Sequence, residues 1–460
     1  MAAAVAFDAE LIRRYDTRGP RYTSYPTALQ FDDTFGTADY RAAALLSNAQ
    51  LTGLSLYVHV PFCASPCFYC ACNRVITRNA AHGERYVAAL AREIELQAEL
   101  FHSRRRVDQL HFGGGTPTFL EPALIGSIVD RLAEHFTLNQ GKDREFSIEI
   151  DPRTVGDSTI SRLADSGFNR YSLGVQDFDP LVQRAVNREQ SVEEVGSVVR
   201  QIRATGCDAV SFDLIYGLPF QTLPGFERTL RQVIDMRPNR IAIYGYAHLP
   251  AAVKAQRQIE ADTLPGPSER LDLLQLSVAV LTAAGYVHIG MDHFALPEDS
   301  LVKAWQAGSL QRNFQGYSSH ANCDLVGLGV SAIGKVSHTL AQNHKDLEHY
   351  YRCIDDSRLA IARGRKLTLD DRLRASVIQQ IMCDGTIDCA AVERAFCIEF
   401  DSYFATELVR LRRMLDDGVL MEVGTHIRVS PRGRFLLRNV AMAFDAYTTA
   451  TRSAAHATAI

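Results

Sequence analysis

The chain has 460 residues, which exceeds what one hydrophobic core usually serves, so we expect a main domain and a smaller one. Hydrophobic residues make up 47% and charged residues 22%, as in an ordinary globular protein, and the net charge of −4 argues against a nucleic-acid partner. No run of about eighteen or more apolar residues is present, so the sequence predicts no membrane span.

The N-terminal residues MAAAVAFDAELIRR carry acidic side chains and no basic region ahead of the apolar ones, so we expect no secretory signal. Ten cysteines without such a signal favour a reducing compartment, and we expect a cytoplasmic protein. Residues 1–50 are predicted to form an N-terminal arm. It contains RGPRYTSYPTALQF, in which a glycine and two prolines interrupt any helix. A simple tail packed on the surface is the alternative for this segment.

From Ser55 on, apolar strands alternate with longer amphipathic helices, a pattern that implies a parallel α/β sheet. The predicted strands are 54–60, 109–112, 146–150, 170–175, 209–215, 240–244 and 286–290. The predicted helices are 83–100, 121–135, 158–166, 193–205, 223–236 and 268–284. About six such units fall short of the eight of a closed barrel. In such a fold, reactive residues are expected on the loops that follow the strands.

A group of cysteines directly follows the first predicted strand. Cys63, Cys67, Cys70 and Cys72 are spaced C-x3-C-x2-C-x-C, close enough for their thiolates to converge on one metal centre. A zinc site would normally use two well-separated pairs, and no second pair is present. Buried structural cysteines are another alternative, but so dense a group is improbable by chance. The spacing predicts a metal cluster, with zinc as the minor alternative.

Further motifs follow other predicted strands. HFGGGTPT carries three consecutive glycines, 113–115, whose exposed backbone lets a ligand approach closely, although a tight turn is the alternative. Glu149, Gln176 and Asp213 each end a strand, where any one of them could be a turn former. Three at equivalent ends predict a shared polar ligand at the barrel mouth. Arg188, in VNREQ, is either a partner for a ligand carboxylate or a solvated helix residue.

The first three cysteines, spaced x3–x2 after an apolar strand, resemble the cluster motif of the radical S-adenosylmethionine (SAM) enzymes. The resemblance implies a [4Fe–4S] cluster held by Cys63, Cys67 and Cys70, with one iron left open for the amino and carboxylate groups of SAM. Cys72 lies two residues from Cys70 and is predicted not to be a ligand. The resemblance also implies a partial (β/α)6 TIM-like barrel of the radical SAM type over residues 51–366.

Beyond the superfamily, the chain resembles the oxygen-independent coproporphyrinogen III oxidases (coproporphyrinogen dehydrogenases) of haem biosynthesis. The motifs that carry this resemblance are YVHVPFC…CFYCACN, HFGGGTPT, NRYSLGVQDF, VNREQ, DLIYGLP, YAHLP, GMDHFA, RNFQGY and GVSAIG, and they span nearly the whole chain. Tyr69 stands where members often carry Phe, a conservative change for stacking. The alternative is a radical-SAM-like haem chaperone without decarboxylase activity, against which the Cys70-Ala-Cys72-Asn73 tail and the Tyr-rich arm argue.

The resemblance implies two bound SAM molecules. The first is expected to involve Tyr57, Gly113, Glu149 and Ile333 beside the cluster. The second is expected to involve Tyr69, Gly114, Gly115, Thr116, Gln176, Arg188, Asp213 and Ala247. Aromatic and aliphatic side chains can pack on adenine, while glycine backbone and carboxylates bind the polar parts. The residues expected to matter for catalysis are Tyr57, His59, Glu149, Gln315 and Ile333. Arg21, in the arm, is the candidate for binding a substrate propionate.

The implied reaction converts two propionates of coproporphyrinogen III into the vinyl groups of protoporphyrinogen IX. No acid or base side chain can remove the unactivated β-hydrogen at neutral pH, so a cofactor must carry this chemistry. An electron from the cluster cleaves SAM, and the resulting 5′-deoxyadenosyl radical takes the hydrogen before CO2 and one electron leave. Cluster potentials reach about −700 mV, so reduced flavodoxin or ferredoxin is the expected donor. A monomer is the default oligomeric state.

After about residue 367 the pattern changes. Predicted helices at 370–383, 389–396 and 403–417 precede GVLMEVGTHIRVS, which is typical of a hairpin, and Pro431 is expected to open a last helix. Residues 367–460 are therefore predicted to form a small, mainly helical, winged-helix-like domain. We interpret it as a lid that closes the barrel mouth against water and oxygen.

Overall fold

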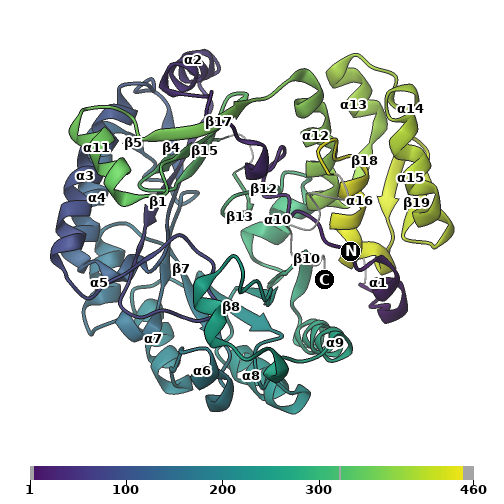
Figure 1. Cartoon of the computed structure of the whole chain (residues 1–460), viewed down its shortest axis with the longest axis horizontal. Helices are drawn as coiled ribbons and strands as arrows, with labels where there is room; N and C mark the ends of the chain where they lie inside the picture. The colour runs from purple at the N-terminus through teal and green to yellow at the C-terminus, as the bar shows by residue number, and fades with distance from the viewer. Residues whose placement is uncertain (1–4, 321–322, 449–460) are drawn as a thin grey trace.

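The central feature of this computed structural model, which describes residues 5–320 and 323–448, is one large sheet with helices along its outer side (Figure 1). Its parallel strands pair in chain order. They are β1 (Leu54–Val60), β4 (Arg106–Gly114), β6 (Glu145–Ile150), β7 (Arg170–Gln176), β8 (Val210–Tyr216) and β9 (Arg240–Gly245). Each matches a strand predicted from the sequence, because buried apolar runs between glycine- and proline-rich turns mark parallel strands.

Both ends of the sheet are antiparallel. Beyond β1 lie β14 (Asp324–Leu328), parallel to it, and then antiparallel β15 (Ile333–Val336), β16 (Thr339–Asn343) and β17 (Ile361–Lys366). Beyond β9 lies β11 (His293–Ala295), which is antiparallel to β9, and then β10 (Val287–Gly290), which is antiparallel to β11. The short strand β5 (Thr137–Leu138) pairs in parallel with β4. Because β10 and β17 are the two ends of the strand order, the sheet stays open, and the predicted partial barrel is confirmed. The predicted strand 286–290 is β10, and it runs in the same direction as β9, because each of the two is antiparallel to β11. The sequence did not indicate β11, which lies between β9 and β10 in the sheet.

Six helices that cover the sheet begin and end close to their predicted positions. They are α3 (Ala81–Ala98), α4 (Pro122–His135), α5 (Thr159–Asp165), α7 (Val192–Ala204), α8 (Leu223–Asp235) and α9 (Pro267–Ala283). The sequence did not predict α6 (Pro180–Ala185), α10 (Ser300–Gln306) and α11 (Leu347–Asp355). Helix α7 starts at a capping box, in which Ser191 and Glu194 each bond the other's backbone N–H. No described helix is both long and apolar enough to cross a lipid bilayer.

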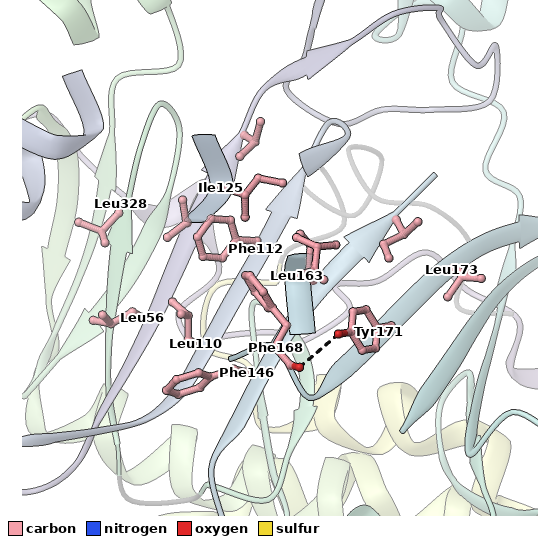
Figure 2. Packing of buried hydrophobic residues seen from close by; sticks show 14 of the residues in the cluster. Leu56, Leu110, Phe112, Ile125, Phe146, Leu163, Phe168, Tyr171, Leu173 and Leu328 are labelled. Carbon is pink, nitrogen blue, oxygen red and sulfur yellow. Dashed lines mark hydrogen bonds between the residues drawn. The ribbon is translucent and has the colours of Figure 1, made fainter. Parts of the chain in front are cut away.

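The main core lies between the strands and these helices. Figure 2 shows Leu56, Leu110 and Phe112 of the central strands packed with Ile125 and Leu163 of the covering helices. All of them are fully buried. Because side chains alternate along a strand, the residues between these apolar ones face the barrel interior instead. The outer layer therefore fixes the strands, and the inner face carries the polar residues.

The N-terminal arm packs against the C-terminal part of the chain. Its helices α1 (Ala9–Tyr15) and α2 (Thr37–Asn48) flank an extended segment that is interrupted only by the 3-10 turn η1 (Ala28–Gln30), so the predicted lack of a continuous helix is confirmed. Leu11, Tyr22 and Tyr25 share a hydrophobic core with the C-terminal helices, and the Tyr22 hydroxyl donates to Asp445 at 2.8 Å.

The C-terminal part is mainly helical, as expected. It comprises α12 (Leu369–Asp384), β18 (Thr386–Asp388), α13 (Cys389–Phe396), α14 (Phe400–Tyr403), α15 (Ala405–Asp416), β19 (Leu420–Val423), β20 (His426–Val429), the 3-10 helix η6 (Pro431–Leu436) and α16 (Leu437–Ala443). The predicted hairpin is β19–β20, and β18 adds a third strand that the sequence did not indicate.

Candidate active site

The cysteine loop and the glycine loop meet at one cavity of about 380 Å³ at the carboxyl ends of the parallel strands. This volume is typical of a small-molecule site. The predicted site residues that line it are Cys63, Cys67, Cys70, Tyr69, Gly114, Gly115, Thr116, Glu149, Gln176, Arg188 and Asp213, together with Cys72. The fold thus gathers residues from five adjacent strands and the loops that follow them into a single site. The expectation that Asp213 ends a strand is wrong, because Asp213 lies in the middle of β8.

Backbone pairing gives the cysteine loop its shape. Strand β2 (Phe62–Cys63) pairs with β3 (Val75–Ile76), which closes the loop at its base. Inside the loop, the Arg74 guanidinium donates to the carbonyls of Cys67 (3.1 Å) and Cys70, so the chain is folded around this cation. The Thr116 hydroxyl donates to the Cys63 sulfur at 3.3 Å and joins the cysteine loop to the glycine loop.

The arrangement of the thiols fits a cluster better than a single metal ion. Among the described residues, no three Cys, His, Asp or Glu side chains converge as ligands of one ion. The cysteines of a [4Fe–4S] cube bind different irons, so they stand farther apart than the ligands of one zinc. The Arg188 and Arg153 guanidinium groups donate to the Cys67 sulfur at 3.8 and 3.9 Å.

The thiols of the loop differ in their surroundings. Burial raises the pKa of Cys63 to about 11, whereas hydrogen bonding from Cys72 and the charge of Arg74 lower the pKa of Cys70 to about 6. Metal binding deprotonates a thiol, so a cluster bound by Cys63 would have to offset the cost of ionising this buried thiol. Cys72 is exposed because it faces the open cavity. Its predicted exclusion from the ligand set stays a prediction.

A hydrogen-bonded chain connects the inner face of β1 to the cysteine loop. The Tyr57 hydroxyl donates to His59 Nδ1 at 3.0 Å, and His59 Nε2 donates to the Asn73 carbonyl at 3.1 Å. A carbonyl only accepts, so Nε2 carries the proton and Nδ1 accepts. Burial lowers the pKa of His59, which keeps this tautomer neutral. His59 is therefore a positioning residue for Tyr57.

Glu149 is held at the centre of the site by two donors. His111 Nε2 donates to one carboxylate oxygen at 3.2 Å, and the Gly114 N–H donates to the other at 3.1 Å. His111 also stacks on Tyr57, with ring centroids 5.8 Å apart. Burial alone would raise the pKa of Glu149, but the His111 and Gly114 hydrogen bonds bring it below the usual value. Glu149 is thus an ionised carboxylate, suited to an ammonium group.

The pKa of Asp213, on β8, is shifted in the opposite direction; β7 lies between β8 and the strand of Glu149. Burial and then the charge of Glu149 raise the pKa of Asp213 to about 7, although Ser172 donates to its carboxylate at 3.1 Å. Two carboxylates whose pKa values are pushed apart can play different roles in one site. A hydroxyl or ammonium donor of a ligand would suit Asp213 when it is ionised.

Replacing Asp213 should change how stability depends on pH. An unfolded aspartate has a pKa of about 3.9, so the folded protein binds more protons between that value and 7, and stability falls as pH rises through this window. Asp213→Asn removes this proton uptake. Denaturant unfolding of the cofactor-free chain at about pH 5 and about pH 8 should show that the free energy of unfolding falls less with pH in the variant than in the wild type. The exposed control Asp157→Asn should behave like the wild type. A fall in Asp213→Asn equal to that of the wild type or of this control would contradict the raised pKa of Asp213.

The structure places the remaining predicted SAM residues around the same site. Gln176 lies at an irregularity between β7 and β8 with φ of 65°, a strained conformation that is often found at functional sites. Arg188 donates to Asp151 Oδ2 at 2.7 Å and to the Gly174 carbonyl at 2.7 Å, so it already has a counter-ion. Ala247 lines neither this cavity nor the next, but Gln256 donates to the carbonyls of both Ala247 and Tyr69 at 3.0 Å.

A second cavity of about 360 Å³ continues from the first into the barrel, and Tyr69, Glu149, Ser172, Gln176 and Asp213 line both. Gln315 faces this second cavity, and both polar atoms of its side chain are buried without a partner among the described residues. An unsatisfied buried amide is costly, so it is suited to a ligand.

Gly113, Ile333 and Arg21 line neither cavity, as is also true of Tyr57 and His59. The backbone of Ile333 packs against Gly327, which is the β14 neighbour of Tyr57. Arg21 forms an ion pair with Asp292 and lies 5.3 Å above the Tyr244 ring. Tyr244 lines the second cavity, so Arg21 stands just behind its wall.

Sequence reasoning missed several residues of the site. Arg74, Asp151 and Arg153 line the first cavity, and His111 lines the second. Asp151 and His111 had a usable signal, because each stands two positions from a predicted site residue on the same strand or at its end. The Arg74 guanidinium donates hydrogen bonds to backbone carbonyls of the cysteine loop, and such contacts cannot be predicted from a residue pattern.

Comparison with known proteins agrees with this geometry. Residues 57–233 match the radical SAM superfamily, and residues 367–436 match the HemN C-terminal domain. The sheet, the cysteine loop and the cavity that joins them are therefore those of a radical SAM enzyme, and its cofactors are a [4Fe–4S] cluster and SAM.

Comparison with individual proteins identifies the family more narrowly. The chain is 47% identical to the oxygen-independent coproporphyrinogen III oxidase of Pseudomonas aeruginosa, over 97% of each chain, and 44% identical to that of Escherichia coli, over 96% of each. The solved structure described as coproporphyrinogen III oxidase (HemN) from Escherichia coli, a radical SAM enzyme, superposes with a TM-score of 0.92 at 42% identity, covering 96% of this chain and 100% of that one. The chain belongs to the oxygen-independent coproporphyrinogen III oxidase family.

Proposed function

We propose that this protein is an oxidoreductase that converts coproporphyrinogen III to protoporphyrinogen IX without oxygen. The observation that carries this proposal is the shared wall of the two cavities. Cys63, Cys67 and Cys70 line the first cavity, and five residues common to both open it onto the polar interior of the barrel. A reactive group generated at the cysteines would meet a substrate held in the second cavity.

The reaction must remove one hydrogen atom, one CO2 and one electron from each of two propionates to leave vinyl groups. When bound, the cluster and SAM supply hydrogen-atom abstraction from an unactivated carbon. The protein binds and orients the reactants and excludes water. Glu149, fixed by His111 and Gly114, would accept hydrogen bonds from the SAM ammonium group. Tyr57, held by His59, would pack on the same molecule together with Gly113 and Ile333.

A second SAM molecule would occupy the other side of the first cavity. We place it against Tyr69, Gln176, Asp213 and the backbone of Gly114, Gly115 and Thr116, with Ala247 at its edge. The Asp151–Arg188 pair has a specific part in this proposal. Burial alone would lower the pKa of Arg188, but Tyr69, Asp151 and Cys67 raise it, so the guanidinium stays charged and can turn toward a SAM carboxylate.

Other features of the proposal concern partners and location. Reduced flavodoxin or ferredoxin would deliver electrons, and the chain would act as a monomer in the cytoplasm. Residues 1–50 would form an arm, 51–366 the barrel domain, and 367–460 a lid that closes the barrel mouth. The contacts of the arm support the lid proposal, because the arm connects the C-terminal part to the barrel domain. Tyr22 and Tyr25 lie in the hydrophobic core of the C-terminal part, and Arg21 forms an ion pair with Asp292 of the barrel domain.

The test is an anaerobic assay of the reconstituted protein with coproporphyrinogen III, SAM and a reductant. Product would be followed as protoporphyrin fluorescence after oxidation, together with released CO2. We expect two CO2 and two molecules of cleaved SAM for each protoporphyrin. Stoichiometric haem binding without any vinyl product would instead support the haem-chaperone alternative.

Arg21 is expected to bind a propionate, so Arg21→Gln should raise the KM for coproporphyrinogen III. A charge-assisted hydrogen bond contributes about 1.5–3 kcal/mol, which corresponds to a rise of about 10- to 100-fold. SAM cleavage without substrate should be unchanged, because Arg21 lies outside the first cavity. Arg13→Gln, on exposed α1, is the matched control. A KM for Arg21→Gln equal to that of this control would refute the role.

A further inference from the structure

Arg312 lies on a small hairpin, β12 (Gln311–Asn313) paired with β13 (Gly316–Ser318). Gln315, Tyr317 and Ser318 of this hairpin line the second cavity. The partner of Arg312 in register is Tyr317, and the guanidinium carbon lies 4.8 Å from the centre of the Tyr317 ring. The Tyr317 hydroxyl donates to the Met382 carbonyl at 2.7 Å, which anchors the hairpin to α12. Arg312 is therefore held in place, and only 6% of its surface is exposed.

This buried cation has no counter-ion. Within residues 5–320 and 323–448, no carboxylate forms an ion pair with Arg312, and its Nη1 atom has no hydrogen-bond partner. Its Nε donates to the Arg21 backbone carbonyl at 3.3 Å, a single weak interaction. Burying an unpaired charge is strongly unfavourable, so such a group is retained where an anion will complete the site.

Other cations crowd the same place. Burial and then Arg312 lower the pKa of Arg21, while burial, Arg21 and Arg312 lower the pKa of Arg438 to about 9. Burial, Arg312 and Arg21 also lower the pKa of His293, which lines the second cavity. Arg21 forms an ion pair with Asp292. Arg312, which pairs with no carboxylate in the part of the chain that the structure describes, therefore adds positive charge that is not compensated there.

Arg312 also lines a third cavity of about 550 Å³ between the arm, the hairpin and α12. Gln109 lines both the second and the third cavity, so these two adjoin. Gln315, at the turn of the same hairpin, faces the second cavity. A ligand that fills the second cavity and extends past Gln315 would bring its edge to Arg312.

We infer that Arg312 is a substrate-binding residue that holds a propionate of coproporphyrinogen III which is not the one reacting, in a carboxylate site shared with Arg21. The inference rests on the proposed function and assigns part of its specificity. A tetrapyrrole carries its propionates around the ring, so one can stand at the cysteine cavity while another pairs with Arg312. The planar guanidinium suits bidentate pairing with a carboxylate.

The test compares coproporphyrin III with its uncharged tetraamide as ligands of the full-length, anaerobically reconstituted protein, by the shift of the porphyrin absorption band. Arg312→Gln should weaken binding of coproporphyrin III by about 10- to 100-fold and leave binding of the tetraamide unchanged. Arg312→Lys, which keeps the positive charge, should lose less affinity for coproporphyrin III than Arg312→Gln does. The matched control is Arg434→Gln, because Arg434 is equally buried and lines none of the three cavities.

Two results would overturn the inference. One is wild-type affinity of Arg312→Gln for coproporphyrin III, and the other is an equal loss for both ligands, which marks general damage to the pocket. The KM for coproporphyrinogen III, measured beside substrate-free SAM cleavage, separates this inference from the proposed function. A wild-type protein that forms no vinyl product would refute the function itself, whereas normal turnover with an unaltered KM in Arg312→Gln refutes only the role of Arg312.

Discussion

Cys63→Ala is expected to abolish vinyl formation and to remove most of the bound iron. Cys63 is buried at the base of the loop, where β2 pairs with β3 and the Thr116 hydroxyl bonds its sulfur. No other thiol among the described residues can replace it from that side, because Cys67, Cys70 and Cys72 all follow it on the same turn of chain. Iron and sulfide content, the visible absorption of the cluster and anaerobic turnover measure the effect.

Two further cysteine variants make this test specific. Cys353→Ala removes a buried cysteine of α11 that lines none of the cavities, and it should keep full iron content and activity. Cys72→Ala removes the exposed thiol of the cysteine loop and should also keep the cluster. A Cys63→Ala protein with wild-type turnover, or a Cys72→Ala protein without iron, would contradict the proposed three-cysteine ligand set.

Much of this site could be predicted because its determinants are local. The cysteines, the three glycines and Glu149 lie at or just after the ends of strands whose apolar residues can be recognised in the sequence, and parallel strands end at a common edge. The order of those strands follows from their order in the chain. Residues that lie far apart in sequence, such as Cys63 and Asp213, therefore come together for a reason that simple patterns contain.

What could not be predicted depends on contacts that only the fold creates. Arg188 pairs with Asp151 because the loop after α6 returns across β7, and spacing gives no sign of this. Strands β14 to β17 were missed because each is short, with little apolar alternation to mark it. The burial of Arg312 could not be predicted either. An arginine near a glycine turn is expected to be exposed to solvent, and only the packing of the arm and α12 buries it.

Alanine substitutions in the glycine loop test how much space the site leaves for an added Cβ atom. A Cβ atom at Gly115 would stand 2.8 Å from backbone atoms of Pro61 and 2.9 Å from the Phe62 carbonyl oxygen, and neither can move while β1 stays paired. A Cβ at Gly113 would stand 2.9 Å from a Glu149 carboxylate oxygen, the far end of a side chain that can turn away. The two substitutions are equal in chemistry and differ only in what they displace.

We therefore expect Gly115→Ala to displace the cysteine loop and to lose both iron and activity, since overpacking against fixed backbone costs about 1–3 kcal/mol or more. Gly113→Ala should keep its iron but bind SAM about tenfold more weakly, because it turns Glu149 away from its place and a charge-assisted hydrogen bond is worth about 1.5–3 kcal/mol. Gly36→Ala, with an extended φ of −133° and no atom within 4 Å of the added Cβ, controls for general loss of backbone freedom. Iron content, equilibrium SAM binding and thermal unfolding separate the three variants. Equal loss of iron in Gly113→Ala and Gly115→Ala would show that the loop moves as one rigid body and that Glu149 is not an independent SAM ligand.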